Sequence, residues 1–260
     1  MAQRSFKLAI SPCPNDTFMF DAIINRRIDL GGMSFDVEYL DIEQLNRRAL
    51  SRYADFSKCS AALLPAIAQS YTLLDSGAAL GRGNGPLLVR RTGDNTPLRR
   101  IAVPGLHTTA NALVERLFPH IEQREPRLFS EIAEAVERGE YDGGVLIHEG
   151  RFVYQERNLS LVADLGVEWE RRTGLPLPLG AIVAARDLDE EDVRAFEALL
   201  RRSIEYAFAH PSLSREFIRS HAQEMDDDVI DRHIALFVND YSLSLGDEGR
   251  EAMRIVCGTM

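Results

Sequence analysis

The sequence predicts an α/β fold with two lobes and mostly parallel sheets. Over the first two thirds of the 260 residues, short apolar runs alternate with segments in which apolar residues recur at helical spacing. Strands that alternate with helices in this way are typical of parallel sheets. Beyond Asp189 only helical spacing is found, with breaks near Pro211, Glu224 and Gly246.

Two linker-like stretches, at residues 92–97 and 174–178, indicate where the chain crosses between the lobes. The first is polar, and the second alternates leucine with proline. They predict a first lobe of residues 1–95 and 178–260 and an inserted second lobe of residues 96–177. A ligand is then expected in the cleft between the lobes, at the carboxyl ends of the strands. A single doubly wound domain is the alternative that the pattern leaves open.

The individual elements follow from local patterns along the chain. An apolar run at residues 6–10 predicts a buried strand, and a helix is expected after it. Asp41 is expected to cap a second helix. The remaining expectations are strands at residues 35–39, 54–58, 86–89, 100–103, 143–147 and 179–184, and helices at about 61–70, 109–118 and 130–139.

Composition excludes several classes of protein. Forty acidic against thirty basic residues give a net charge of −10, which argues against a nucleic-acid partner. The sequence has no run of about 18 apolar residues to span a membrane and no signal-peptide pattern at its start. Cys13, Cys59 and Cys257 are too scattered for a disulfide framework or a zinc site. We therefore expect a cytoplasmic protein that binds a small molecule, with a homodimer as one option for its oligomeric state.

The charge is also distributed unevenly along the chain. From Ala181 to the end, seventeen acidic residues against nine arginines give a net charge of −8, which leaves −2 for the first 180 residues. An anionic ligand is therefore expected to bind to the first 180 residues. Only Lys7 and Lys58 of the thirty basic residues are lysines. A genome that favours arginine codons accounts for most of this bias.

His148 is the candidate general base. It directly follows the predicted strand at residues 143–147 and so is expected at a strand end, where ligands bind in open parallel sheets. Imidazole titrates near neutral pH, which suits it to proton transfer. The alternative is a structural histidine that caps the strand.

Two further segments are expected to hold an anionic group of the ligand. Lys58 ends the third predicted strand, where its ammonium can pair with a carboxylate and Ser60 can donate a hydrogen bond. Thr108 and Thr109 open a predicted helix, where free amides and the helix dipole favour an anion. The alternatives are a surface lysine and a threonine that only caps the helix.

The turn SPCPNDT at residues 11–17 is another polar segment at a strand end. Its two prolines stiffen the backbone, and Ser11 and Asn15 are expected to point polar groups at the cleft. The alternative is an ordinary helix-capping loop. The other histidines lack ligand spacing and are interpreted as surface or helix-end residues: His120, His210, His221 and His233.

Five segments together resemble the 1,4-dihydroxy-6-naphthoate synthase family of the futalosine route to menaquinone. They are SPCPNDTF at residues 11–18, GAALGRG at 77–83, VPGLHTT at 103–109, LIHE at 146–149 and RTGLPLPLG at 172–180. The resemblance extends from about residue 5 to residue 210. The last fifty residues match the family only in helical character.

The resemblance implies a two-lobed fold like that of the type 2 periplasmic binding proteins. It implies a lyase that cleaves cyclic dehypoxanthinyl futalosine to 1,4-dihydroxy-6-naphthoate without a metal or organic cofactor. The family's catalytic and substrate-contact positions fall on His148, on Lys58, Cys59 and Ser60, and on Thr108 and Thr109. Cys59 departs from the larger aliphatic residue that is usual there. The alternatives are the chorismate dehydratase of the same pathway and a non-catalytic small-anion binding protein.

Overall fold

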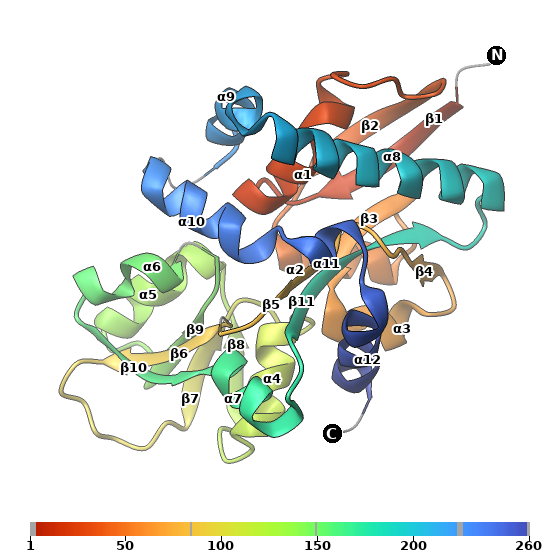
Figure 1. The fold of residues 1–260 in the computed structure, drawn as a ribbon. Helices are drawn as coiled ribbons and strands as arrows, with labels where there is room; N and C mark the ends of the chain where they lie inside the picture. The colour runs from red at the N-terminus through yellow and green to blue at the C-terminus, as the bar shows by residue number, and fades with distance from the viewer. Residues whose placement is uncertain (1–3, 84, 149, 223–225, 259–260) are drawn as a thin grey trace.

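The protein consists of two sheets with helices packed around them, and the chain passes between the sheets twice (Figure 1). The structure is a computed structural model that describes residues 4–83, 85–148, 150–222 and 226–258. Within the described residues, no helix is both long enough and apolar enough to cross a membrane.

The first sheet contains strands from both ends of the chain. Its order is β2-β1-β3-β11-β4, and β5 pairs with β11 beside β4. The strands are β1 (Arg4–Ile10), β2 (Met33–Tyr39), β3 (Phe56–Ser60), β4 (Tyr71–Leu73), β5 (Ala79–Gly81) and β11 (Leu177–Ala185).

The second sheet is built from the middle of the chain. Its order is β10-β6-β9-β7-β8. The strands are β6 (Leu87–Arg91), β7 (Arg100–Val103), β8 (Gln123–Pro126), β9 (Gly143–Leu146) and β10 (Leu159–Asp164).

The expectation of mostly parallel sheets is wrong, because both sheets are mixed. Among the strand pairings of the described residues, four are parallel and five are antiparallel. β6 and β11 carry the chain between the sheets and run antiparallel to their neighbours β9 and β3. The predicted α/β class agrees with the structure, and so does the arrangement in two sheets.

The first passage between the sheets lies earlier in the chain than the predicted boundary at residue 95. β6 was expected in the first lobe, but it lies between β9 and β10 in the second sheet. The chain therefore leaves the first sheet after Gly81, and the polar stretch 92–97 only connects β6 to β7. A polar loop has the same local pattern whether it joins two strands of one sheet or two lobes. The return passage leads into β11 at Leu177.

The helices cover the sheets and fill the space between them (Figure 1). Asp41 caps α2 through a capping box with Gln44, as the sequence predicts. The helices are α1 (Pro14–Ile24), α2 (Ile42–Leu50), α3 (Leu64–Ile67), α4 (Thr109–Leu117), α5 (Phe129–Glu137), α6 (Gly150–Val153), α7 (Leu165–Thr173), α8 (Glu190–Ala209), α9 (Arg215–Arg219), α10 (Asp227–Phe237), α11 (Asp240–Leu243) and α12 (Gly246–Cys257).

The C-terminal helices pack mainly on the first lobe. α8 packs on α1, whereas α10 packs on both α1 and β5 and lies between the lobes (Figure 1). One apolar cluster also runs from Leu80 in β5 to Leu88 in β6 and Trp169 in α7. The indole Nε1 of Trp169 donates to Pro176 O over 3.1 Å. The two lobes therefore share a core at the point where the chain crosses between them.

Candidate active site

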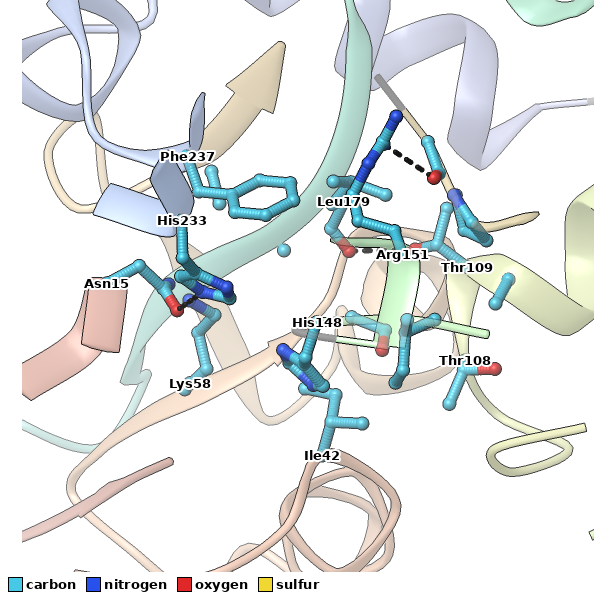
Figure 2. Close-up of a pocket in the computed structure, with 17 residues that line it drawn as sticks. Asn15, Ile42, Lys58, Thr108, Thr109, His148, Arg151, Leu179, His233 and Phe237 are labelled. Carbon is cyan, nitrogen blue, oxygen red and sulfur yellow. Dashed lines mark hydrogen bonds between the residues drawn. The ribbon is translucent and has the colours of Figure 1, made fainter. Parts of the chain in front are cut away.

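A cavity lies between the lobes, and residues of both lobes line it (Figure 2). Strand ends and helix starts supply most of the wall, as expected for an α/β ligand site. The lining residues are Asn15, Ile42, Lys58, Ser60, Ala79, Gly85, Pro86, Thr108, Thr109, Ala110, Ile147, His148, Arg151, Leu179, Gly180, His233 and Phe237. Six of the predicted site residues are therefore brought together: Asn15, Lys58, Ser60, Thr108, Thr109 and His148.

Lys58 is held by a buried carboxylate rather than left free for a ligand. Its Nζ lies 2.5 Å from Oδ1 of Asp16, and both side chains are buried. Asp16 Oδ2 accepts hydrogen bonds from the hydroxyl of Ser11 over 2.7 Å and from the amide of Ser11 over 3.1 Å. Asn15 Nδ2 donates to Asp16 Oδ1 over 2.8 Å. The charge of Lys58 is thus balanced within the protein, at the start of α1.

His148 faces the cavity as a neutral imidazole. Its backbone φ is +52°, a left-handed conformation that few residues other than glycine adopt. Burial lowers the pKa of His148 to about 4, with the ammonium of Lys58 lowering it further and Asp16 opposing the shift. The ring packs edge-on against Phe129, with the centroids 4.9 Å apart. His148 can therefore accept a proton at neutral pH.

The threonines at the start of α4 use their hydroxyls within the protein. Thr108 Oγ1 donates to Gly105 O over 2.7 Å and accepts from the amide of Asn111 over 3.2 Å, so it caps the helix. Thr109 Oγ1 donates to Leu179 O over 2.9 Å and accepts from the amide of Ala62 over 3.2 Å. Thr109 thus ties α4 to the first lobe. The first-turn amides are the groups of this segment that an anion in the cavity can use.

Two predicted site residues do not line the cavity. Cys59 is fully buried in an apolar cluster with Leu63 and Val183, because successive residues of β3 point to opposite faces of the sheet. Ser11 donates to Asp16 below the cavity wall. The structure therefore places Cys59 and Ser11 outside the cavity lining, and Ser11 contacts the site through Asp16.

Arg151 and His233 also line the cavity, although neither was predicted to do so from the sequence. His233 was interpreted as a surface or helix-end residue, but it is fully buried on α10 and lines the cavity. Its spacing from Ile230 and Phe237 places it on the apolar face of that helix, and this signal was available in the sequence. Arg151 donates to Gly85 O over 2.8 Å and to Asp164 Oδ2 over 3.1 Å.

A polar contact joins the lobes at the edge of the cavity. Glu43 on α2 accepts a hydrogen bond from the backbone amide of His107 over 3.2 Å, and its Oε1 lies 2.8 Å from Nδ1 of that histidine. Asn46, one turn further along α2, donates to His107 O over 3.2 Å and to Ser60 Oγ over 2.9 Å. α2 thereby holds the loop that leads into α4.

These features define a two-lobed α/β protein with its ligand cavity between the lobes. A Candida albicans protein described as having the generic periplasmic binding protein fold superimposes with a TM-score of 0.70, over 97% of this chain and 90% of that one, at 13% identity. The predicted fold class is confirmed. A crystal structure of a protein from Archaeoglobus fulgidus gives a TM-score of 0.89 at 32% identity, over 97% of this chain and 95% of that one.

The chain belongs to the menaquinone biosynthesis family, whose model matches residues 6–258. A 1,4-dihydroxy-6-naphthoate synthase of Thermus thermophilus is 44% identical over 257 residues, which cover 96% of this chain and 91% of that protein. One from Streptomyces coelicolor is 40% identical over 260 residues, which cover 98% of this chain and 92% of that protein. The resemblance that the five motifs indicate is confirmed, and the chain is an enzyme of menaquinone biosynthesis.

Proposed function

We propose that the enzyme converts cyclic dehypoxanthinyl futalosine to 1,4-dihydroxy-6-naphthoate, with His148 as the general base. The observation that carries this proposal is the neutral imidazole of His148 in the cavity. The chain is also 44% identical to a 1,4-dihydroxy-6-naphthoate synthase. His148 takes a proton from a hydroxyl of the substrate or from the adjacent carbon. The sugar-derived piece then leaves by cleavage of a carbon–carbon bond, and formation of the aromatic naphthoate ring supplies the driving force.

The charges around the cavity support a particular place for the substrate carboxylate. Lys58 is paired with Asp16, and Arg151 is paired with Asp164, so neither cation is left uncompensated. The first-turn amides of α4 carry the positive end of a nine-residue helix and line the same cavity. We propose that the carboxylate binds at these amides, with the Lys58–Asp16 pair in the same wall of the cavity.

Enclosure between the lobes supports the chemistry in a second way. The cavity wall combines apolar side chains, such as Ile42 and Phe237, with a few polar groups. Exclusion of water strengthens each polar contact to the substrate and keeps His148 unprotonated. An imidazole can accept a proton in this way without the help of a metal ion.

The decisive experiment is incubation of the purified protein with cyclic dehypoxanthinyl futalosine, followed by detection of naphthoate absorbance. Loss of a positioned base costs about 100- to 10,000-fold in rate, so His148→Asn is expected to lower kcat by that factor. His210, which is exposed at the end of α8, supplies the matched control His210→Asn. Near-normal turnover by His148→Asn would contradict the assigned base.

The same assay separates the alternative functions. Consumption of chorismate in place of the cyclic substrate would identify a dehydratase of the same pathway. Tight binding of the cyclic substrate without product would identify a non-catalytic small-anion binding protein. Either result would overturn the proposed activity.

A further inference from the structure

His233 carries a buried, unsatisfied ring nitrogen beside the cavity. The side chain is fully buried and lines the cavity from α10. Its Nδ1 has no hydrogen-bond partner among the described residues. A buried polar atom without a partner destabilises the folded protein, so such an atom beside a ligand cavity points to a partner that the ligand brings.

The protonation of His233 follows from its neighbours. Asp16 accepts hydrogen bonds as a carboxylate, so the group of Asn15 that faces it must be the donor Nδ2, 2.8 Å from Oδ1 of Asp16. The other atom of the Asn15 amide, Oδ1, therefore faces His233 and accepts from Nε2 over 3.0 Å. Nε2 thus carries the proton of the ring.

The second nitrogen of the ring is consequently an acceptor. Burial lowers the pKa of His233 well below its usual value, and the proximity of His148 and Lys58 lowers it further. A neutral imidazole with its proton on Nε2 has a lone pair on Nδ1. Only a donor can satisfy this atom, and a carboxylate cannot.

The position of the ring relates this acceptor to the base. The rings of His233 and His148 are nearly parallel, with an interplanar angle of 20° and centroids 6.0 Å apart. Figure 2 shows both rings beside the same space, together with Asn15 and Lys58. The two imidazoles therefore lie beside the same part of the cavity.

We propose that Nδ1 of His233 accepts a hydrogen bond from a hydroxyl of the sugar-derived part of the substrate and positions that part beside His148. This inference rests on the proposed function, which supplies a substrate with such hydroxyls. His233 selects for a hydroxyl donor, whereas the start of α4 selects for an anion. The two ends of the substrate are thereby distinguished by opposite hydrogen-bonding character.

Two substitutions at residue 233 separate the two nitrogens. In His233→Gln, the longer amide reaches the place of Nε2 and keeps a donor for Asn15, but the acceptor at Nδ1 is lost. In His233→Asn, the amide oxygen takes the place of Nδ1, and the contact with Asn15 is lost. We expect His233→Gln to lower kcat/KM by about tenfold, the size of one neutral hydrogen bond, and His233→Asn to lower it less.

The controls make each outcome decisive. His210→Gln changes an exposed histidine and is expected to leave kcat/KM at the wild-type value, and thermal unfolding shows whether each variant is folded. Wild-type kcat/KM in His233→Gln would overturn the inference, and so would equal losses in both variants, because equal losses indicate packing alone. A wild-type enzyme that forms no naphthoate would instead overturn the proposed function and this inference with it.

A spectroscopic measurement tests the same contact without changing His233. In the His148→Asn variant, substrate can be bound while turnover is slow. The ¹⁵N resonance of His233 Nδ1 is expected to move from the range of an unprotonated nitrogen toward that of a hydrogen-bonded one when cyclic dehypoxanthinyl futalosine is added. An unchanged resonance at saturating substrate would overturn the inference.

Discussion

Lys58 Nζ and Asp16 Oδ1 lie 2.5 Å apart below the cavity, and neither side chain is exposed. The pair joins the middle of β3 to the first turn of α1, and the two residues are 42 apart in sequence. Because Asp16 also accepts from Ser11 and Asn15, it organises the whole turn that precedes α1. Lys58 therefore shapes the site as one member of a buried pair.

Asp16→Asn is expected to lower the free energy of unfolding by about 3–5 kcal/mol, because it leaves the buried ammonium of Lys58 without its counter-charge. Urea denaturation monitored by circular dichroism measures this change. Glu190→Gln removes an exposed i,i+4 partner of Arg194 and is expected to change the free energy by less than about 0.5 kcal/mol. A similar, small effect in both variants would show that the Asp16–Lys58 pair does not stabilise the fold.

Because His148 is the proposed base, kcat/KM is expected to fall only at an unusually low pH. Because its pKa is lowered to about 4, the imidazole is neutral and able to accept a proton above that pH, and it loses this capacity as the pH falls through 4. Activity at pH 5.5 should thus be close to that at pH 7.5, whereas an ordinary histidine would lose about tenfold over this interval. Circular dichroism at each pH confirms that the protein stays folded.

The lowered pKa of His148 also predicts the direction in which the free energy of unfolding changes with pH. Between pH 4 and 6.5 the unfolded chain binds a proton at His148 that the folded protein does not bind. The free energy of unfolding is therefore expected to rise with pH across this window, and to rise less steeply in His148→Asn. Urea midpoints at pH 5 and pH 7 for both proteins measure the difference. Identical slopes would contradict a lowered pKa in the folded state.

Much of the cavity wall could be predicted because it depends on local positions. Lys58 and Ser60 end a strand, His148 follows one, and Thr108 begins a helix, so alternation and capping patterns alone place them at the cleft. The same alternation should have excluded Cys59, which lies between two residues of the cavity face. Cys59 was predicted at the site because it lies within a contiguous segment of the family's substrate-contact positions.

The rest of the site depends on packing that no local pattern specifies. His233 lies on the apolar face of α10, which predicts burial, but which surface that helix covers is decided by contacts with α1 and β5. The sheet membership of β6 is open for a similar reason, since its short apolar run at residues 87–89 fits either sheet. The predicted boundary at residue 95 followed from the polar loop after β6. Pairing with β9 instead places β6 in the second sheet.

Glu43→Gln is expected to loosen the contact between the lobes and to raise KM by about five- to tenfold. The substitution replaces the carboxylate that accepts from the amide of His107 and lies 2.8 Å from its ring, and hydrogen bonds to charged groups contribute about 1.5–3 kcal/mol. kcat is expected to change less, because Glu43 does not line the cavity. Glu115→Gln, at an exposed partner of Arg124, is the control and should leave KM unchanged. An unaltered KM in Glu43→Gln would mean that this contact does not govern closure.

Gly180→Ala is expected to disturb the cavity without unfolding the protein. A Cβ at Gly180 would lie 2.8 Å from Cε of Lys58 and 3.1 Å from Cys59 O, so the lysine side chain must shift within the cavity wall. Overpacking of this kind costs about 1–3 kcal/mol, and we expect a loss of kcat/KM with it. In Gly249→Ala the nearest atoms are side-chain atoms at 3.3 Å, and activity should stay at the wild-type level. Full activity of Gly180→Ala would show that the position of Lys58 is not critical.

Cys59→Ala is expected to leave KM for the substrate unchanged, although the residue lies between two residues of the cavity wall. β3 turns Lys58 and Ser60 toward the cavity and Cys59 toward Leu63 and Val183, so the thiol has no path to the ligand. Burial also raises the pKa of Cys59 to about 12, so iodoacetamide at pH 8 should not alkylate it in the folded protein. Kinetics of the variant and mass spectrometry of the alkylated wild type test both statements. A raised KM, or protection of Cys59 that appears only with bound substrate, would place the thiol in the cavity and contradict the strand's alternation.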